Sequence, residues 1–269
     1  MQEFLVRTSH RLRPLPIGRW RMTQRWNDLL FAHWPVPATS IAPLLPAGLQ
    51  VDTYQGSAWV SIIPFWIDRV KFRNGTRLPT AEGIPALNLR TLVQGEKTKT
   101  PGFYAFSLDD CNLMTVMLGR GLLHLPYHWA KMSFEQKTER EFAFSSRRRF
   151  ARQPVLFQAR YRGLGPSRKL TEAHAGSFES FLLERNCLFS SNHRGELLRS
   201  NLHHISWPLE EAEAQIERND LANAAGISLP RQEPVLHYMR RLAVYIWPAE
   251  RVRPAIAARP VRVAVTPSG

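Results

Sequence analysis

The feature that most constrains the fold of this chain is a series of strand-length segments joined by turns. The segment 87–94 alternates, with one side formed by Leu87, Leu89, Thr91 and Val93 and the other by Asn88, Arg90, Leu92 and Gln94. Further strands are predicted over residues 26–36, 58–70, 103–110, 133–150, 154–165 and 234–248, with hairpin turns at 55–56 and 192–195. We therefore predict a β-rich α+β domain, a closed or half-closed antiparallel β-barrel of about ten strands.

Helical periodicity is confined to short segments. A brief helix is expected within residues 37–49, with Thr39 and Ser40 as candidate caps, and Asp110 is the candidate N-cap of a helix over 111–123. Residues 177–184 form another short helix. Residues 209–225 are expected to form an amphipathic helix with an inner face of Leu209, Ala212, Ile216 and Leu221.

The division into domains follows from composition. Residues 1–22 form a loosely held N-terminal arm, residues 23–247 a single domain, and residues 248–269 a tail rich in proline and arginine that is expected to be disordered. Residues 1–20 and 251–269 lack an apolar period that would tie them to a core, so both are predicted to be dispensable for folding.

The charge of the chain is strongly positive, +14, with 36 Lys and Arg against 22 Asp and Glu. The densest basic region comprises Arg147, Arg148, Arg149, Arg152, Arg160, Arg162, Arg168 and Lys169. It carries no helix-turn-helix, zinc-finger or RNP motif, so no specific nucleic-acid partner is expected. No apolar run reaches the ~18 residues of a membrane span, and no signal peptide is evident, so a cytoplasmic location is expected.

Metal and cofactor motifs are missing from the sequence. Cys111 and Cys187 form no CxxC pair, and His124 and His128 are separated by Pro126, which breaks the helical spacing that a shared metal would need. His203 and His204 are adjacent and would point to opposite faces of a strand. No glycine-rich phosphate loop or GxSxG elbow occurs. Neither a metal nor a cofactor is predicted.

The segment from Gly119 to Met132, GRGLLHLPYHWAKM, is the first candidate for a binding site. Pro126 forces a change of chain direction and fixes the side chains that follow, Tyr127 and His128. They either line a cavity or are satisfied within a buried corner of the sheet. Asn88 and Arg90 share the polar face of one strand, where they would orient and pair an anionic or carbonyl group if that face is interior. Arg120 has the same two interpretations.

Six blocks in this order carry a family resemblance: WNDLLFAHWPVP, LLPAGLQVDTYQGSAWVSIIPF, LNLRTLV, PGFYAFSLDD, GRGLLHLPYHWAKM and FLLERNCLFSSNHRGELLRSNLHHISWPL. Over residues 23–244 the chain resembles the YqjF-like family of uncharacterised bacterial proteins, which is similar to acetoacetate decarboxylase. The resemblance implies a β-barrel-like fold that encloses a small-molecule cavity.

The chain departs from that resemblance where the decarboxylase chemistry resides. Acetoacetate decarboxylases carry a Gly-Tyr-Pro-Lys-type segment whose lysine forms a Schiff base, and here Tyr127 stands where that lysine would be. The nearest lysine is Lys131. Related sequences also tend to carry an acidic residue where this chain has Ala86. We therefore expect no decarboxylase chemistry.

The expected function is the binding of a small anionic or carbonyl-containing molecule in the barrel by Asn88, Arg90, Arg120, Tyr127 and His128. Catalysis is left unassigned, and oligomerisation is compatible with the sequence. Two alternatives remain open: a lysine-dependent decarboxylase or aldolase-type enzyme that uses Lys131, and a basic interaction protein whose barrel is only a scaffold.

Overall fold

The fold is seen in a computed structural model that describes residues 5–11, 13–77, 83–170 and 174–252. Strands make up most of this part of the chain: β1 (Met22–Pro37), β2 (Leu49–Val51), β3 (Ser57–Phe72), β4 (Ile84–Gly95), β5 (Pro101–Asp110), β6 (Tyr127–Gln136), β7 (Glu141–Arg148), β8 (Leu156–Gly163), β9 (Arg168–Lys169), β10 (Cys187–Ser191), β11 (Leu197–His203), β12 (Pro208–Glu210), β13 (Ala212–Asn219), β14 (Val235–Ile246) and β15 (Glu250–Arg251). The helices are short: α2 (Ala38–Ile41), the 3-10 turn η1 (Ala42–Leu44), α3 (Leu113–Leu123), α4 (Phe178–Leu183) and α5 (Leu221–Ala224).

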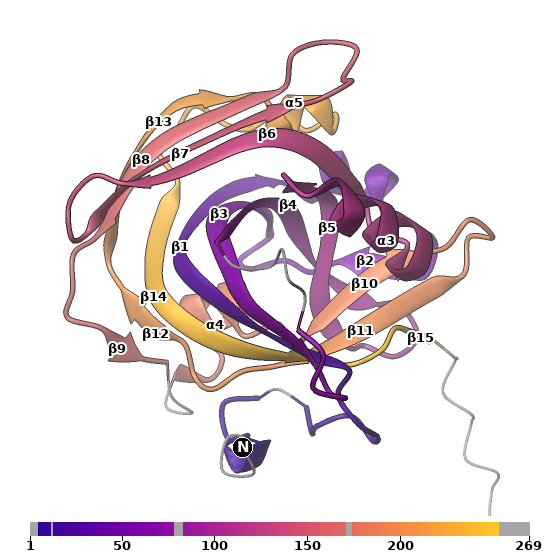
Figure 1. Cartoon of the computed structure of the whole chain (residues 1–269). Helices are drawn as coiled ribbons and strands as arrows, with labels where there is room; N and C mark the ends of the chain where they lie inside the picture. The colour runs from indigo at the N-terminus through magenta and orange to yellow at the C-terminus, as the bar shows by residue number, and fades with distance from the viewer. Residues whose placement is uncertain (1–4, 12, 78–82, 171–173, 253–269) are drawn as a thin grey trace, which may run out of the picture.

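Seven strands close into a ring of hydrogen-bonded neighbours in the order β5, β10, β11, β14, β1, β3, β4 and back to β5 (Figure 1). Ring closure follows because β5 pairs with β4 on one edge and with β10 on the other. Pairing is antiparallel except between β5 and β10 and between β5 and β6. The predicted β-rich α+β fold with a closed sheet is confirmed.

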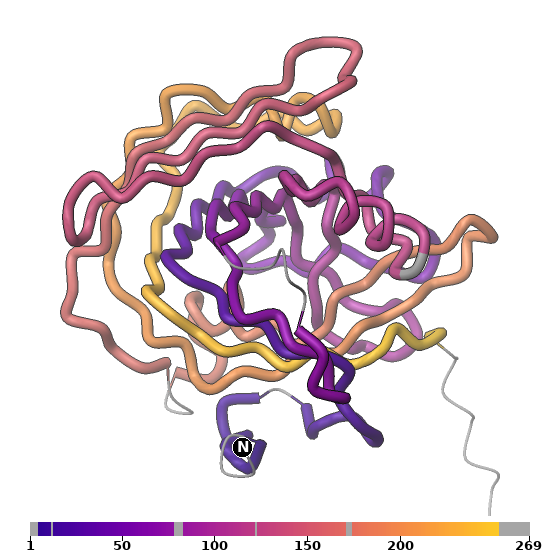
Figure 2. The backbone as a smooth tube through the Cα atoms, in the orientation of Figure 1, coloured from indigo at the N-terminus to yellow at the C-terminus, as the bar shows by residue number. Residues whose placement is uncertain are grey.

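A second layer, formed by β6, β7, β8 and β13, arches over the outside of the ring (Figure 2). The period-two alternation of β1 divides its apolar side chains between two cores. Leu30, Ala32 and Trp34 pack with Phe144 and Phe157 of the outer layer. Leu29 and Phe31 instead belong to a core on the other face, together with Trp59, Phe103 and the α4 residues Leu182 and Leu183. We refer to this second face as the interior face of the ring.

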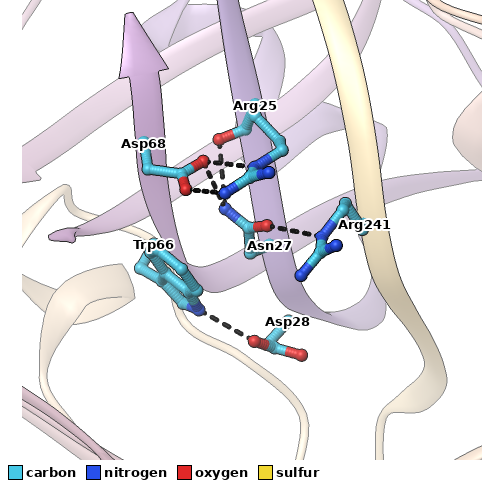
Figure 3. A network of polar contacts seen from close by, with 6 residues as sticks. All are labelled: Arg25, Asn27, Asp28, Trp66, Asp68 and Arg241. Atoms are coloured by element: carbon cyan, nitrogen blue, oxygen red, sulfur yellow. Dashed lines mark hydrogen bonds and ion pairs between the residues drawn. The ribbon is translucent and has the colours of Figure 1, made fainter. Parts of the chain in front are cut away.

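A bend in β1 is held by polar contacts from neighbouring strands (Figure 3). Asp28 has φ of 48° at a register shift against β3, a left-handed conformation that Asp adopts more readily than most residues. Its carboxylate accepts hydrogen bonds from Trp66 Nε1 at 2.8 Å and from the Tyr238 hydroxyl at 2.6 Å. These contacts fix the bulge at which β1 changes register.

An ion pair lies beside this bend, between Arg25 and Asp68 (Figure 3). Asn27 Nδ2 also donates to Asp68, and Arg241 Nε donates to Asn27 Oδ1. Burial alone would raise the pKa of Asp68, but hydrogen bonds from Arg25 and Asn27 outweigh it and lower that pKa. The network therefore ties β1 to β3 and β14 next to the register shift in β1.

The amphipathic helix predicted over residues 209–225 is wrong. Residues 208–219 are the strands β12 and β13, and helix is limited to α5. Ala212, Ala214 and Ile216 pack toward the core, whereas Glu213 and Gln215 alternate outward. This alternation is that of a strand. β13 pairs with β8, and the pairing satisfies the backbone groups at the edge of β8.

Three local expectations also need correction. The turn predicted at 55–56 is formed, with Tyr54 bridging Ser57, but the strand before it, β2, pairs with β4 and not with β3. Asp110 is not the N-cap of α3: Asn112 caps it by accepting from Thr115 N at 3.1 Å, and Asp110 accepts from Asn112 N. No side-chain cap hydrogen bond is made at the start of α2, where Pro37 is the N-cap residue.

The N-terminal arm is packed against the sheet where the structure describes it. Trp20 is buried with Tyr245 and Trp247, and the Trp247 indole donates to Gly18 O. In the expected tail, residues 248–252 are ordered and include β15, which pairs with β11; residues 253–269 lie outside the described residues. Among the described residues, no helix is long and apolar enough to cross a membrane.

Candidate functional site

A row of polar side chains crosses three strands of the ring at one level. His33 of β1 is the direct register partner of Ser61 of β3, which is in turn the partner of Arg90 of β4. Directly paired residues lie on the same face of a sheet, so all three share the interior face. All three are buried, and His33 Nδ1 lies 2.7 Å from Ser61 Oγ.

Arg90 is the most unusual member of this row. It is only 5% exposed, and its Nε and Nη2 atoms have no hydrogen-bond partner. Its guanidinium lies 4.7 Å from the ring centroid of Phe103 and 5.8 Å from that of Phe31. Burial, and then the nearby charge of Arg185, lower the pKa of Arg90 to about 9. A buried guanidinium with two unpaired donors has the chemistry to pair with an anion.

Other unpartnered nitrogen atoms lie on the same interior face. His33 Nε2 and Trp59 Nε1 are buried without partners, as is Nδ1 of His237. The ring centroids of His33 and His237 are 5.7 Å apart, and His237 Nε2 contacts a Glu179 carboxylate oxygen at 3.4 Å. Burial lowers the pKa of His33 well below its usual value, so its imidazole is neutral. The indole and guanidinium groups can donate hydrogen bonds to a bound molecule.

Tyr127 and Asn88 lie on the same side of the ring as Arg90. In β5, Leu108 pairs with Asn88 and Ala105 pairs with Arg90. Tyr127 packs against both of these β5 residues. The two predicted site residues on β4 and the predicted tyrosine on β6 therefore share the interior face, on either side of β5.

An acidic residue lies directly opposite Ala86 on the neighbouring strand. Asp110 is the register partner of Ala86 and is 3% exposed. Burial raises the pKa of Asp110 to about 6, although the hydrogen bond from Asn112 N acts in the opposite direction. Tyr127 lies on the adjacent strand β6, whose residues pair with Leu108 and Asp110, and burial, followed by the charge of Asp110, raises the pKa of Tyr127. The face thus holds an acid whose pKa is close to neutrality.

Two of the five predicted site residues are placed elsewhere. Arg120 is exposed on α3, where its Nε donates to the backbone oxygen of Tyr127 at 2.6 Å. His128 is the register partner of Asp109, which pairs in turn with Leu87 of the outer core, so His128 is directed to the opposite face from Tyr127. Burial, with Arg148 and Arg120 nearby, lowers the pKa of His128 to about 4.

Asp109 is a structural residue. It forms a buried ion pair with Arg148, whose Nη2 lies 2.9 Å from Asp109 Oδ1 and also donates to Ser107 Oγ. This pair ties β5 to β7 across the face opposite the candidate site.

The lysines are all on the surface. The chain has six, all of them exposed: Lys71, Lys97, Lys99, Lys131, Lys137 and Lys169. Lys131 lies in the outer layer, where its register partner is Arg147. A Schiff-base lysine is activated in an apolar pocket or beside a second cation in a site closed to water. The position of Lys131 argues against the lysine-dependent alternative.

Sequence reasoning missed His33, Ser61 and His237. The signal that could have identified them is a single polar residue within an apolar strand, as in Ala32-His33-Trp34 and Val60-Ser61-Ile62. A polar residue within an apolar strand can point toward either of the two cores. Only the strand register shows that His33 and Ser61 lie beside Arg90. A separate buried group, His10, Glu184 and His204, has donor atoms suited to a metal ion and is treated below.

Comparison with known proteins supports the fold and defines relatives. Residues 23–243 match the DUF2071 family, described as an uncharacterized conserved protein. The uncharacterized protein YqjF of Bacillus subtilis is 38% identical over 237 residues, which cover 88% of this chain and 95% of that protein. The resemblance to YqjF-like sequences is confirmed.

The similar solved structures are acetoacetate decarboxylase-like. The enduracididine biosynthesis enzyme MppR complexed with pyruvate has a TM-score of 0.58 at 8% identity, with 88% of this chain and 93% of that chain covered. Acetoacetate decarboxylase from Legionella pneumophila has a TM-score of 0.56 at 12% identity, with coverage of 94% and 97%. An acetoacetate decarboxylase-like enzyme from Sphingomonas wittichii has a TM-score of 0.58 at 14% identity, with coverage of 91% and 98%. At these identities the likeness shows the fold alone.

Proposed function

Because this chain belongs to the DUF2071 family and has an acetoacetate decarboxylase-like fold, we propose that it binds a small carboxylate on the interior face of the ring. Arg90 pairs with the carboxylate of the ligand. Asn88, Tyr127 and Trp59 supply the hydrogen bonds that orient the rest of the molecule. His33 and Ser61, hydrogen-bonded to each other, form the polar surface beside Arg90.

One observation carries this proposal: Arg90 is buried, and its Nε and Nη2 atoms are unpaired. Within the described residues, Arg90 has no acidic partner, and the charge that acts on it most strongly is that of another cation, Arg185. Arg185 itself is neutralised by Asp52. A planar guanidinium with two free N–H groups matches the two oxygens of a carboxylate.

The ligand class suggested by these groups is a small keto acid. The carboxylate of the ligand would pair with the Arg90 guanidinium. Its carbonyl oxygen would accept a hydrogen bond from a neutral donor such as the Trp59 indole. Pyruvate is bound by MppR, whose chain has a similar fold. Binding here proceeds without an imine, because every lysine of the chain is exposed and Tyr127 cannot form one.

A calorimetric titration with pyruvate and with acetoacetate tests the proposal. Arg90→Met keeps an unbranched apolar side chain at this position but removes the guanidinium and both donors. We expect it to weaken binding at least tenfold, since a hydrogen bond to a charged group contributes about 1.5–3 kcal/mol. Arg231→Met is the matched control, because Arg231 is exposed in the loop before β14 and lies outside the site. It should leave the affinity unchanged.

Borohydride reduction in the presence of either ligand completes the test. We expect no covalent adduct by peptide mass spectrometry. A stable adduct on Lys131 that disappears in Lys131→Ala would instead establish the lysine-dependent alternative. Equal affinity of the wild-type chain and Arg90→Met would overturn the proposed role of Arg90.

A further inference from the structure

A second buried polar cluster lies where the N-terminal arm meets α4 and β11. His10 comes from the arm, Glu184 follows α4, and His204 follows β11. One donor atom from each of the three side chains lies within 4.8 Å of the others. All three residues are buried, with exposures of 8%, 2% and 2%. Three distant segments of the chain therefore bring two imidazoles and one carboxylate to a single point.

Backbone carbonyls fix which nitrogen atom of each imidazole carries the proton. His204 Nδ1 lies 2.7 Å from the Ile205 carbonyl oxygen, which can only accept, so Nδ1 is the protonated nitrogen. The His10 ring is hydrogen-bonded to the backbone of His204, and His10 Nε2 has no partner. In both neutral rings Nε2 is therefore the nitrogen with a lone pair available to a metal ion. An outer hydrogen bond from Nδ1 to a carbonyl is the usual arrangement of a metal-binding histidine.

Glu184 is the part of the cluster that most needs a partner. Both of its carboxylate oxygens are buried without a hydrogen bond, although a buried carboxylate normally has several. Burial raises the pKa of Glu184 to about 8 against the opposing charge of Arg11, whose guanidinium donates instead to Leu202 O at 2.7 Å. Nothing among the described side chains satisfies either oxygen, so the site holds an acceptor group with no donor.

We propose that His10, Glu184 and His204 bind a divalent transition-metal ion of the zinc class. Two imidazole nitrogens and one carboxylate oxygen are the ligand set of many zinc sites, whereas calcium and magnesium prefer oxygen ligands alone. A tetrahedral zinc ion with bonds of about 2.0–2.2 Å needs ligand atoms roughly 3.4 Å apart. Small side-chain rotations bring the three donor atoms to that spacing.

A cavity adjoins the cluster at Glu184. Glu184 lines a cavity of about 360 Å³ whose wall also includes Arg11, Arg13, Asn186 and Arg199. A water molecule or a small anion can reach the ion from this side, and the arginines favour an anion. The Asn186 amide, which now lies 3.3 Å from His204 Nε2, leaves that nitrogen when the ion binds.

Cobalt(II) titration of the full chain tests the proposal, because a tetrahedral Co²⁺ site is visible by absorption and does not depend on any activity. We expect one Co²⁺ per chain, displaced by Zn²⁺ and quantified by elemental analysis after dialysis. Glu184→Gln and His10→Ala should each weaken binding at least about 100-fold, more than the loss of an outer-shell partner. His193→Ala, at an exposed histidine, is the matched control.

Two results would overturn the proposal. One is the absence of stoichiometric Co²⁺ and Zn²⁺ binding to the folded wild-type chain. The other is binding that survives in both Glu184→Gln and His10→Ala, which would place the ion elsewhere. Circular dichroism of each variant shows whether it is folded. Glu184→Gln keeps the shape of the side chain, so loss of metal in a folded Glu184→Gln chain supports the site even if His10→Ala is unstable.

Discussion

At the scale of single residues, the most informative group is a cation that the fold leaves unneutralised. Burying a charge without a partner costs several kcal/mol, even after the surroundings relax. Arg90 is held in that state between two aromatic rings, which recover part of the cost through cation–π contacts. A residue that lowers stability and yet is rigidly placed is typical of a functional site.

Replacing Arg90 should therefore stabilise the free protein. We expect Arg90→Met to raise the free energy of unfolding by on the order of 1 kcal/mol, because the unpaired buried charge is removed while the volume is kept. The melting temperature should rise by about 2–4 °C. Differential scanning calorimetry without ligand measures this change, and Arg231→Met, at an exposed arginine, serves as control. A clear destabilisation by Arg90→Met would mean that the guanidinium has partners within the protein.

Asp110 should make stability depend on pH. Its folded-state pKa is raised from 3.8 to about 6 by burial, so the folded chain holds this proton more tightly than the unfolded chain does. The stabilisation is fully present below about pH 3.8 and is lost as the pH rises through about 6. Relative to Asp110→Asn, the wild-type chain should lose at most about 1.4 kcal/mol per pH unit over this window. Denaturant titrations at several pH values measure the difference, and parallel curves would contradict it.

The sequence predicted part of the candidate site. Alternation in 87–94 places Asn88 and Arg90 on one face, as the register with β5 shows, and Tyr127 after the bend at Pro126 pairs with Leu108 on that same face. The same bend does not identify the face of the next residue, and His128 lies on the other side of the sheet. Trp59 and His237 could not be predicted, because their proximity to Arg90 depends on which strands pair.

At the scale of elements, the strand β13 shows how a short amphipathic pattern misleads. Leu209, Ala212, Ile216 and Leu221 satisfy a helical period, but Ala212, Ala214 and Ile216 satisfy a period of two equally well. Tertiary pairing decides between the two. β13 pairs its backbone with the edge of β8, and Arg162 of β8 forms an ion pair with Glu213 of β13. The local sequence of residues 209–225 gives no information about this partner strand.

The N-terminal arm is the other element whose packing the sequence pattern does not reveal. Trp20 is 6% exposed and contacts Tyr245 with ring centroids 5.3 Å apart, although the sequence around it has no apolar period. One large aromatic residue is enough to attach a segment that periodicity treats as loose.

Truncation of that aromatic side chain should destabilise the whole domain. We expect Trp20→Ala to lower the free energy of unfolding by roughly 3 kcal/mol, because burial of a large aromatic residue is lost. Ile17→Ala is the matched control, since Ile17 is fully exposed in the same arm and should change stability little. Urea denaturation measures both. Equal stability of Trp20→Ala and the wild-type chain would support the prediction from sequence that the arm is dispensable.

At the scale of the whole molecule, the positive charge is less concentrated than the sequence suggests. Four arginines of the dense basic region are neutralised by acidic partners: Arg148 by Asp109, Arg160 by Glu217, Arg162 by Glu213 and Arg168 by Glu179. The region therefore does not present one continuous basic surface.

Binding to nucleic acid should accordingly be weak and nonspecific. We expect the affinity for random duplex DNA to fall steeply between about 50 mM and about 200 mM salt, as counterion release requires. Fluorescence anisotropy with duplexes of different sequence measures both the slope and the selectivity. Sequence-selective binding that persists at physiological salt would favour the interaction-protein alternative.

The architecture as a whole was more accessible to prediction than its details. Alternation and turn residues indicate a closed, strand-rich sheet, and the ring of seven strands agrees with it. They do not show that β6, β7, β8 and β13 form a separate outer layer, because inner and outer strands share the same period of two. The division into layers depends on long-range packing. The same holds for the proximity of His10 to Glu184 and His204.

The central claim, that Arg90 binds a carboxylate inside the ring, is tested most directly by a crystal structure of the chain soaked with pyruvate. We predict density for the ligand on the interior face, with its carboxylate oxygens about 2.7–2.9 Å from Arg90 Nε and Nη2. Density only in the cavity beside Arg11 and Arg13, with Arg90 still unpaired, would contradict it.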